Sequence, residues 1–152
     1  MPKTYDSLTL EDAKRMLSAA EARASSLGIP YNVAVVDAGG HLVAFSRQDG
    51  ALIGSIELAI DKAVTARILD KPTSDLAKLA QPGGPLFGIQ ESNFGKVVIF
   101  GGGIPVVFGG AIVGAVGASA GTVEQDIAVA EAAVAVLHDV EEVVGDSRTR
   151  IR

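Results

Sequence analysis

Two stretches of the chain place apolar residues at the spacing of an amphipathic helix. The first follows Thr9 and Asp12, which form an approximate capping box, and it ends at Gly28. Its apolar stripe consists of Ala13, Met16, Leu17, Ala20, Ala24 and Leu27. The second follows Thr122 and Gln125, a further capping box, and its stripe consists of Ile127, Ala130, Val134 and Leu137. The pattern therefore predicts one helix near each end of the chain.

Between these helices, short runs of β-branched residues alternate with turn residues. Ala38-Gly39-Gly40 and Gly109-Gly110 are hairpin signals, each lying between two such runs. A second helix is predicted from Ser55 to about Leu69, and a short third helix from Ser74 to Ala80. Residues 81–95 form a loop rich in glycine and proline. The predicted strands are residues 31–37, 41–46, 96–100, 104–108 and 111–119.

This order of elements, α-β-β-α-α-β-β-β-α, predicts the class of the fold. Strands joined mostly by hairpins form an antiparallel sheet, and helices at other points of the chain cover its faces. We therefore expect an α+β domain with a five-stranded antiparallel sheet and helices packed on it, in a profilin- or PAS-like arrangement. Residues 1–144 form this single domain. Residues 145–152 have no apolar pattern and are expected to be a mobile tail.

Composition and charge restrict the partners of this domain. Hydrophobic residues make up 48% of the 152 residues and charged residues 20%, as in an ordinary globular domain. A net charge of −5 argues against nucleic acid or an anionic membrane as a partner. Residues 97–123 carry no charge over a length that could span a bilayer, but glycines and Pro105 divide them into short runs typical of buried strands. The N-terminus has no apolar leader, so we expect a cytoplasmic protein.

Two glycine motifs match parts of known signatures. Gly117-Ala-Ser119-Ala-Gly121 fits G-x-S-x-G between a strand and a helix. The only histidine after it, His138, lies about three helical turns beyond Asp126, so the two cannot orient each other as in a serine hydrolase. Gly101-Gly102-Gly103 lacks the spacing of a dinucleotide-binding loop. Both motifs are also explained by tight turns.

Few side chains offer ligands for a metal ion or an anion. The chain has no cysteine and two histidines, so thiolate and histidine-rich centres are excluded. His41, at the start of a strand, and His138 are each a candidate axial ligand of haem or a metal. Glu57 and Asp61 share one helix face, which either holds a hard cation or is simply solvated. The helix start at Thr122 offers free amides to an anion, which nearby acidic residues oppose.

Lys62 is the charged residue with the most unusual surroundings. It lies among small apolar residues within the predicted helix 55–69, and Arg67 follows five positions later. A partly buried lysine can pair with a ligand carboxylate or, with a lowered pKa, act as an acid or base. The alternative is a lysine that extends along the helix edge into water.

Several blocks of sequence together resemble one family. The blocks are Ala34–Leu42, Lys62–Ala66, Gln81–Gln90, Gly101–Pro105 and Gly114–Ser119, followed by Gln125-Asp126. They resemble the haem-binding and haem-degrading family that includes extracellular haem-binding proteins, the glycolate-operon protein G and the C-terminal domain of propanediol-utilisation corrinoid adenosyltransferases. The resemblance extends from about residue 8 to 137, nearly the whole chain.

This resemblance implies an antiparallel α+β domain that assembles into dimers, tetramers or octamers, with haem or a corrinoid bound in some members. Carried over by position, it points to the loop 81–90, Lys62 and the turn 101–105 as pocket or interface. The first hypothesis is an oligomeric protein that binds haem or another tetrapyrrole as its small-molecule ligand, with His41 as a possible axial ligand. The candidate binding residues are Arg47, Lys62, Pro85, Leu86, Phe87, Gly102, Gly103 and Thr122.

Two other hypotheses remain open from the sequence. One is an enzyme of the tautomerase, isomerase or lyase type that acts on a small carboxylic acid. In it, Arg47 and Lys62 would hold the carboxylate. The proton would be moved by Asp37, Glu91 or Lys62 itself. The other is a structural oligomer in which the uncharged, glycine-rich strands form the interface.

Overall fold

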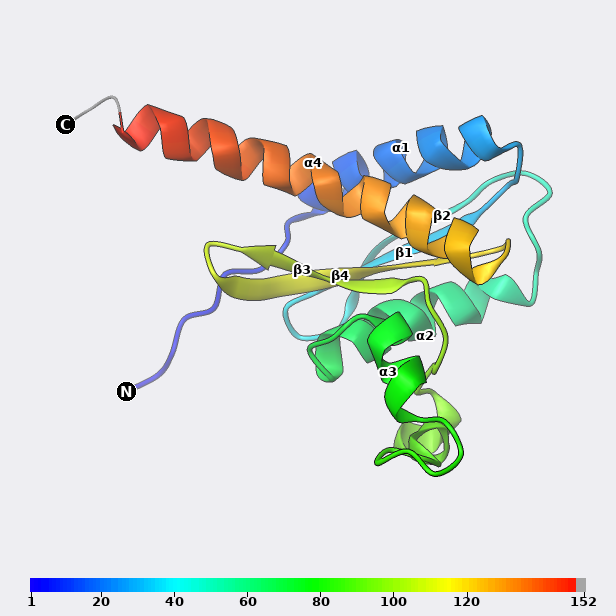
Figure 1. Ribbon diagram of the computed structural model, residues 1–152. Coiled ribbons are helices and arrows are strands. Elements are labelled where there is room, and N and C mark those ends of the chain that lie inside the picture. The colour runs from blue at the N-terminus through cyan, green and yellow to red at the C-terminus, as the bar shows by residue number, and fades with distance from the viewer. Residues whose placement is uncertain (150–152) are drawn as a thin grey trace.

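The chain folds into one antiparallel sheet with helices on both faces (Figure 1). The computed structural model describes the backbone of residues 1–149 and the side chains of residues 1–138. Four strands form the sheet in the order β2-β1-β4-β3, and each neighbouring pair is antiparallel. The strands are β1 (Asn32–Asp37), β2 (Leu42–Arg47), β3 (Gly103–Phe108) and β4 (Ala111–Ser119).

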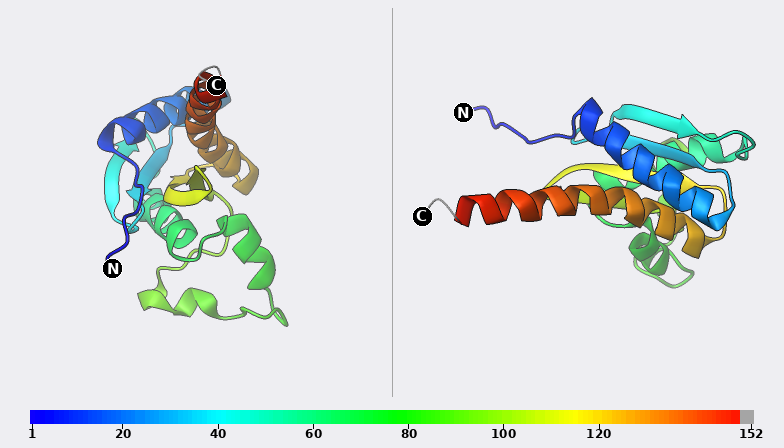
Figure 2. Two further views of the ribbon diagram at one scale, coloured as in Figure 1. Left: turned by 90° about the vertical axis from the view of Figure 1, so that its left-hand side faces the viewer. Right: turned by 90° about the horizontal axis from the view of Figure 1, so that it is seen from above.

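The helices form two layers around this sheet. The two long helices, α1 and α4, lie side by side on one face, and α2 lies on the other (Figures 1 and 2). The short helix α3 and residues 81–95 extend from α2 away from the sheet. No helix among the described residues is long and apolar enough to cross a membrane. The helices are α1 (Leu10–Leu27), α2 (Ser55–Ile68), α3 (Thr73–Leu79) and α4 (Val123–Thr149).

The local signals in the sequence account for most of these elements. The side chain of Thr9 accepts a hydrogen bond from the Asp12 amide, and Asp12 caps Thr9 in return, as the capping box predicts. Gly28 ends α1 in a left-handed conformation at φ 70°. Gly109-Gly110 joins β3 to β4 with positive φ at both residues, as a two-residue hairpin turn requires. The predicted α+β class with an antiparallel sheet is therefore confirmed.

The predicted fifth strand, residues 96–100, is wrong. Val97 and Val98 are buried, as their apolar pattern indicates, but this segment pairs with no strand of the described sheet. Its backbone instead bonds to a side chain of α2. The Thr65 hydroxyl accepts a hydrogen bond from the Val98 amide at 3.1 Å and lies 3.3 Å from the Lys96 carbonyl oxygen, to which it donates. One hydroxyl thus satisfies two of the backbone groups, the Lys96 carbonyl and the Val98 amide, for which a strand would need a partner.

The predicted C-terminal boundary also differs from the helix that the structure shows. Residues 145–149, expected as the start of a mobile tail, continue α4 to Thr149. Residues 150–152 lie outside the described part of the chain.

The two faces of the sheet carry side chains of different size. Toward α1 and α4, β1 directs Val33 and Val35 into a core with valine, leucine and methionine side chains. Toward α2, β1 directs Ala34 and Val36, and the fully buried apolar residues that α2 contributes to this cluster are the alanines Ala59, Ala63 and Ala66. Side chains alternate between the two faces along β1. The layer of side chains between the sheet and α1 and α4 is therefore thick, and the layer between the sheet and α2 is thin.

Gly117 of β4 sets the distance between α2 and the sheet. A Cβ atom built at this glycine would lie against the Ala59 carbonyl oxygen and 2.6 Å from the Ala63 amide nitrogen. The helix backbone therefore rests directly on the strand, with no side chain between them. Any residue larger than glycine at this position forces α2 away from β4.

We expect Gly117→Ala to lower the free energy of unfolding by about 1–3 kcal/mol or more, because the added methyl group has only backbone to displace. Gly54→Ala is the matched control. Gly54 precedes α2 at an ordinary φ of −62°, and a Cβ there meets open space. Urea unfolding of both variants measures the difference, and equal losses in the two would refute the direct contact.

Candidate functional site

A buried carboxylate, Asp126 in the first turn of α4, lies at the centre of a polar cluster inside the fold. Its Oδ1 accepts a hydrogen bond from the Tyr31 hydroxyl at 2.8 Å, and further hydrogen bonds from the amides of Ala120 and Gly121 at 3.2 and 3.0 Å. Its Oδ2 accepts the Lys62 ammonium at 2.7 Å. The carboxylate is thus fully neutralised and hydrogen-bonded, as a buried charge must be.

The sequence predicts that backbone amides at the start of α4 can bind an anion. In the structure they bind an anionic side chain of the same chain, the Asp126 carboxylate. The Gly121 and Ala120 amides donate to Asp126, and the Thr122 amide donates to Gln125 at 2.9 Å. Gln125 and Thr122 complete the predicted capping box. These amides are therefore occupied in the folded chain.

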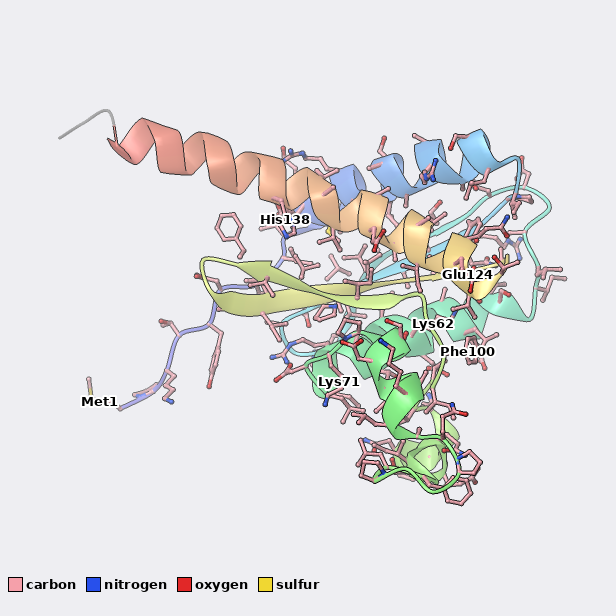
Figure 3. The ribbon with its side chains drawn as sticks, in the orientation of Figure 1. Met1, Lys62, Lys71, Phe100, Glu124 and His138 are labelled. Atoms are coloured by element: carbon pink, nitrogen blue, oxygen red, sulfur yellow. The ribbon has the colours of Figure 1, made fainter. Side chains whose placement is uncertain are left out.

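Lys62 is fully buried and reaches Asp126 across the end of the sheet. Its ammonium also donates to the Ala118 carbonyl oxygen at 3.0 Å and lies 4.7 Å from the centre of the Phe100 ring. Figure 3 shows Lys62 and Phe100 beneath the first turn of α4. Burial lowers the pKa of Lys62, and Asp126 partly offsets this effect.

Tyr31 closes the cluster on the other side. Its side chain is fully buried just before β1. Burial, and then the hydrogen bond to Asp126 and the charge of that carboxylate, raise the pKa of the Tyr31 hydroxyl well above its ordinary value of 10.0. Tyr31 is therefore a hydrogen-bond donor at any physiological pH.

The glycine run Gly101-Gly102-Gly103 wraps closely around this cluster. A Cβ at Gly101 would lie 2.8 Å from the Ile127 side chain, and one at Gly102 would lie 2.9 Å from the Lys62 ammonium. A Cβ at Gly103 would lie against the Lys62 carbonyl oxygen. Gly102 and Gly103 would place a Cβ against backbone atoms of β4 and α2, so close packing requires glycine at these two positions, whereas at Gly101 only side chains of α4 would have to move.

A cavity of about 360 Å³ opens on the outer side of the same glycines, between α3, β3 and α4. Two of the predicted binding residues, Gly102 and Gly103, line it. Its walls are mostly apolar, and two titratable side chains of α4, Glu131 and His138, complete them. The remaining lining residues are Pro72, Ser74, Ile104, Ile127, Val134 and Ala135.

The other predicted site residues lie on separate parts of the surface. Arg47 lines a hollow of about 410 Å³ with Asp49, Gly50, Ala51 and Ile53. Pro85, Leu86 and Phe87 lie in the segment that extends beyond α3, and Glu91 lies there too. Thr122 is exposed at the start of α4. The structure thus brings together only Lys62, Gly102 and Gly103 among the predicted binding residues.

Asp37 and His41 meet at the turn between β1 and β2. The Asp37 carboxylate accepts the amides of Gly39 and His41, each at 2.9 Å, and its Oδ1 lies 3.6 Å from the His41 Nδ1. The His41 side chain is 83% exposed. Arg67 of α2 donates to the Ala38 carbonyl oxygen at 2.6 Å and so fixes the turn against the helix.

Glu57 and Asp61 do not form part of a larger metal-binding group. Among the described residues, no three His, Asp or Glu side chains are close enough to hold a metal ion. Burial raises the pKa of Asp61, while Lys96 lowers it and Glu57 raises it by their charges. The influence of Lys96 places a cation near this helix face.

Sequence reasoning singled out Lys62 but missed the residues that hold it. Asp126 is 64 positions further along the chain, and Tyr31 is 95 positions before Asp126. The sequence did contain one signal for Asp126. An acidic residue in the first turn of an apolar helix can accept hydrogen bonds from the backbone amides that have no partner there. That signal marks Asp126 as an acceptor but does not identify its cation.

The fold and these residues define an α+β domain of a known family. The family model described as "Haem degrading protein HbpS-like" matches residues 8–135, so the chain belongs to this family. A 15.0 kDa protein encoded between dhaT and dhaS in Citrobacter freundii is 43% identical over 84% of this chain and 89% of its own length. The corrinoid adenosyltransferase PduO of the same organism is 39% identical over 87% of this chain, but over 39% of its own length.

Among solved structures, the crystal structure of a PduOC–haem complex superposes with a TM-score of 0.82 and is 40% identical. The match covers 85% of this chain and 94% of the other. The family resemblance predicted from the sequence is therefore confirmed.

We expect Asp126→Asn to cost about 3–5 kcal/mol of stability, because it leaves the Lys62 ammonium buried without a counter-charge. The double variant Lys62→Met with Asp126→Asn should lose clearly less, since neither charge remains. Asp75→Asn, which breaks the exposed pair between Lys78 and Asp75, is the control and should change stability by less than about 1 kcal/mol. Chemical denaturation checks all three, and additive losses in the double variant would contradict the pairing.

Tyr31→Phe should cost about 1–2 kcal/mol at pH 7, because Asp126 loses one buried donor. The raised pKa of Tyr31 stabilises the fold fully below pH 10 and progressively less above it, because the unfolded chain then releases the proton more readily. The difference between the wild type and Tyr31→Phe should therefore stay constant up to about pH 9 and shrink as the pH rises above 10. Tyr5→Phe, at an exposed tyrosine, should show no such trend.

Proposed function

We propose that this protein binds haem or a closely related tetrapyrrole. The observation that carries the proposal is the similarity to the PduOC–haem complex, which extends over nearly all of both chains at 40% identity. Membership of the haem-degrading HbpS-like family supports it independently. The homo-oligomer that the resemblance implies remains a prediction.

The turn between β1 and β2 offers the best axial ligand in the described part of the chain. The Asp37 carboxylate lies 3.6 Å from Nδ1 of His41, which is beyond hydrogen-bond distance, and the imidazole is 83% exposed. Nε2 of His41 is therefore accessible to an iron ion. Leu42 and Ile68, each about half exposed, supply apolar surface near the turn. An accessible imidazole beside apolar surface is compatible with the group, and haem bound there would supply redox-active iron.

His138 is the second candidate ligand, and its surroundings differ. It lines the cavity between α3 and α4, whose 360 Å³ is near the lower end of the range for small-molecule pockets of about 300–1,000 Å³. A tetrapyrrole at this place would be enclosed only in part. We take His41 as the first candidate ligand, because its imidazole is accessible, and His138 as the second.

The alternative hypothesis, an enzyme acting on a small carboxylic acid, gains no comparable support. Lys62 already pairs with Asp126 and has no contact with solvent. Asp37 lies at the end of β1, and Glu91 lies on the segment beyond α3. In this hypothesis Arg47 and Lys62 both bind the substrate carboxylate, but they lie on different elements. Lys62 does not line the hollow of about 410 Å³ to which Arg47 belongs.

Titration of the purified protein with hemin tests the proposal. We expect a Soret shift that saturates at a fixed ratio of haem to chain, because specific coordination has a finite number of sites. His41→Ala should change the position of the Soret band and weaken binding at least tenfold. His138→Ala is the matched control, since it removes the other histidine of the chain.

The three informative outcomes of this titration are distinct. A spectrum equal to free hemin with an unrelated protein would refute haem binding. Saturable binding that depends on His138 but not on His41 would keep the function and move the ligand to the cavity. Saturable binding by a variant that lacks both histidines would point to an oxygen ligand, such as the hydroxyl of exposed Thr122, one of the candidate binding residues.

A further inference from the structure

The cavity between α3, β3 and α4 has the size of a pocket for a small organic molecule. Its volume of about 360 Å³ lies within the usual range for such pockets, and a tetrapyrrole would protrude from it. An apolar cavity of about 150 Å³ holds a benzene molecule. The cavity therefore has room for one aromatic ring together with a short side chain.

Hydrogen bonds within the chain hold two walls of this cavity in place. The Gly103 amide of β3 donates to the buried Thr73 hydroxyl oxygen at 2.9 Å, which joins β3 to the start of α3. The Gly102 carbonyl oxygen accepts a hydrogen bond from the Ala118 amide of β4, also at 2.9 Å. A pocket whose walls are already fixed loses little conformational freedom when it binds, which favours affinity.

Apolar side chains form the inner part of the cavity. Val134 of α4 is buried, and Ile104 of β3 and Ile127 of α4 are half-buried, and all three line it. Water beside such side chains has few hydrogen-bond partners. An apolar group that displaces this water therefore gains free energy.

Glu131 gives the mouth of the cavity a negative charge. It is exposed, and it is the one carboxylate among the residues that line the cavity. A carboxylate on a helix usually finds a cation three or four residues away, but here those positions hold only apolar residues. Among the described residues, Glu131 forms no ion pair, and no lysine or arginine lines the cavity. The four apolar neighbours are Ile127, Ala128, Val134 and Ala135.

Two neutral hydrogen-bonding groups complete the mouth. His138 follows Glu131 by two turns of α4, about 10 Å along the helix axis. Figure 3 shows His138 on the side of α4 that faces the sheet, and the Ser74 hydroxyl lines the cavity from α3. Both groups can donate or accept a hydrogen bond, so they tolerate a polar substituent on a ligand.

This distribution of charge selects a cation with an apolar body. A carboxylate or phosphate ligand would approach Glu131 and meet no lysine or arginine of the described chain. A neutral apolar ligand would remove water from the Glu131 carboxylate and give nothing in return. We propose that the cavity binds a small organic amine. Its ammonium group bonds to the Glu131 carboxylate, and its ring or chain fills the apolar space. This site is separate from the turn at His41, and the proposal does not depend on haem.

Calorimetric titration with phenethylamine tests this proposal, because this amine carries one ring on a short chain. We expect saturable binding of one amine per chain. Glu131→Gln keeps the shape of the side chain and removes its charge, so it should weaken binding about tenfold or more. Glu124→Gln is the matched control. Glu124 is an exposed glutamate of the same helix that does not line the cavity, and its replacement should leave the affinity nearly unchanged.

A ligand of opposite charge gives the second test. Hydrocinnamate has nearly the shape of phenethylamine but carries a carboxylate, and the wild type should bind it much more weakly. Glu131→Lys should reverse this preference, because the cation of the variant then faces the ligand. Glu131 is exposed, so neither variant should change the melting temperature, and a preference that follows the charge cannot come from unfolding.

Three results would overturn the proposal. The first is no saturable heat with phenethylamine at millimolar concentration. The second is equal affinity of the wild type and Glu131→Gln, which would mean that the amine binds elsewhere or without the carboxylate. The third is displacement of the amine by hemin, which would assign the cavity to haem. Hemin that binds while the amine stays bound would support two separate sites.

Discussion

The direct contact between α2 and β4 is the constraint on which the rest of the structure depends. Because Gly117 leaves no side chain between them, the backbone of α2 lies on the sheet itself. A lysine on the buried side of such a helix cannot turn back to water, and Lys62 must extend to the end of the sheet, where α4 begins. Asp126 meets it there with its second oxygen already bound to Tyr31 and two amides. A buried pair of this kind adds little to stability, because desolvation offsets the attraction, but it is satisfied in only one arrangement of α2, β4 and α4.

The periodicity of the sequence predicted the helices and four of the strands, because burial on one face and turn chemistry are local properties. It failed at residues 96–100, where Val97 and Val98 are buried but the hydrogen-bond partner is the Thr65 side chain. An apolar run reports that a segment is inside the fold, and it does not report what satisfies the backbone. The same limit applies to the site. Lys62 was recognisable as a cation among small residues, but nothing local distinguishes Asp126 from the other acidic residues as its partner.

Glycine gave the least specific information. The run Gly101-Gly102-Gly103 and the start of α4 both suggested that the backbone approaches a bound anion or ligand, and in each case the backbone approaches another part of the chain. The space beside the glycines is filled by Lys62, Ala118 and Ile127. The amides at the start of α4 donate their hydrogen bonds to the Asp126 carboxylate. A close approach can be inferred from sequence. The object that is approached depends on which distant segments the fold brings together.

The buried cluster and the cavity are connected through a single turn of α4. Asp126 points inward to Lys62, while Ile127, the next residue, and Glu131, one turn later, line the cavity. Gly102 lies between the two, because a Cβ atom built on it would lie 2.9 Å from the Lys62 ammonium and the residue also lines the cavity. The ion pair thus constrains the rotation of α4 about its own axis, together with the apolar residues that α4 buries in the core, and this rotation decides which side chains face the cavity. Lys62 therefore influences the surface on which ligands can bind through packing and register, without contact with solvent or ligand.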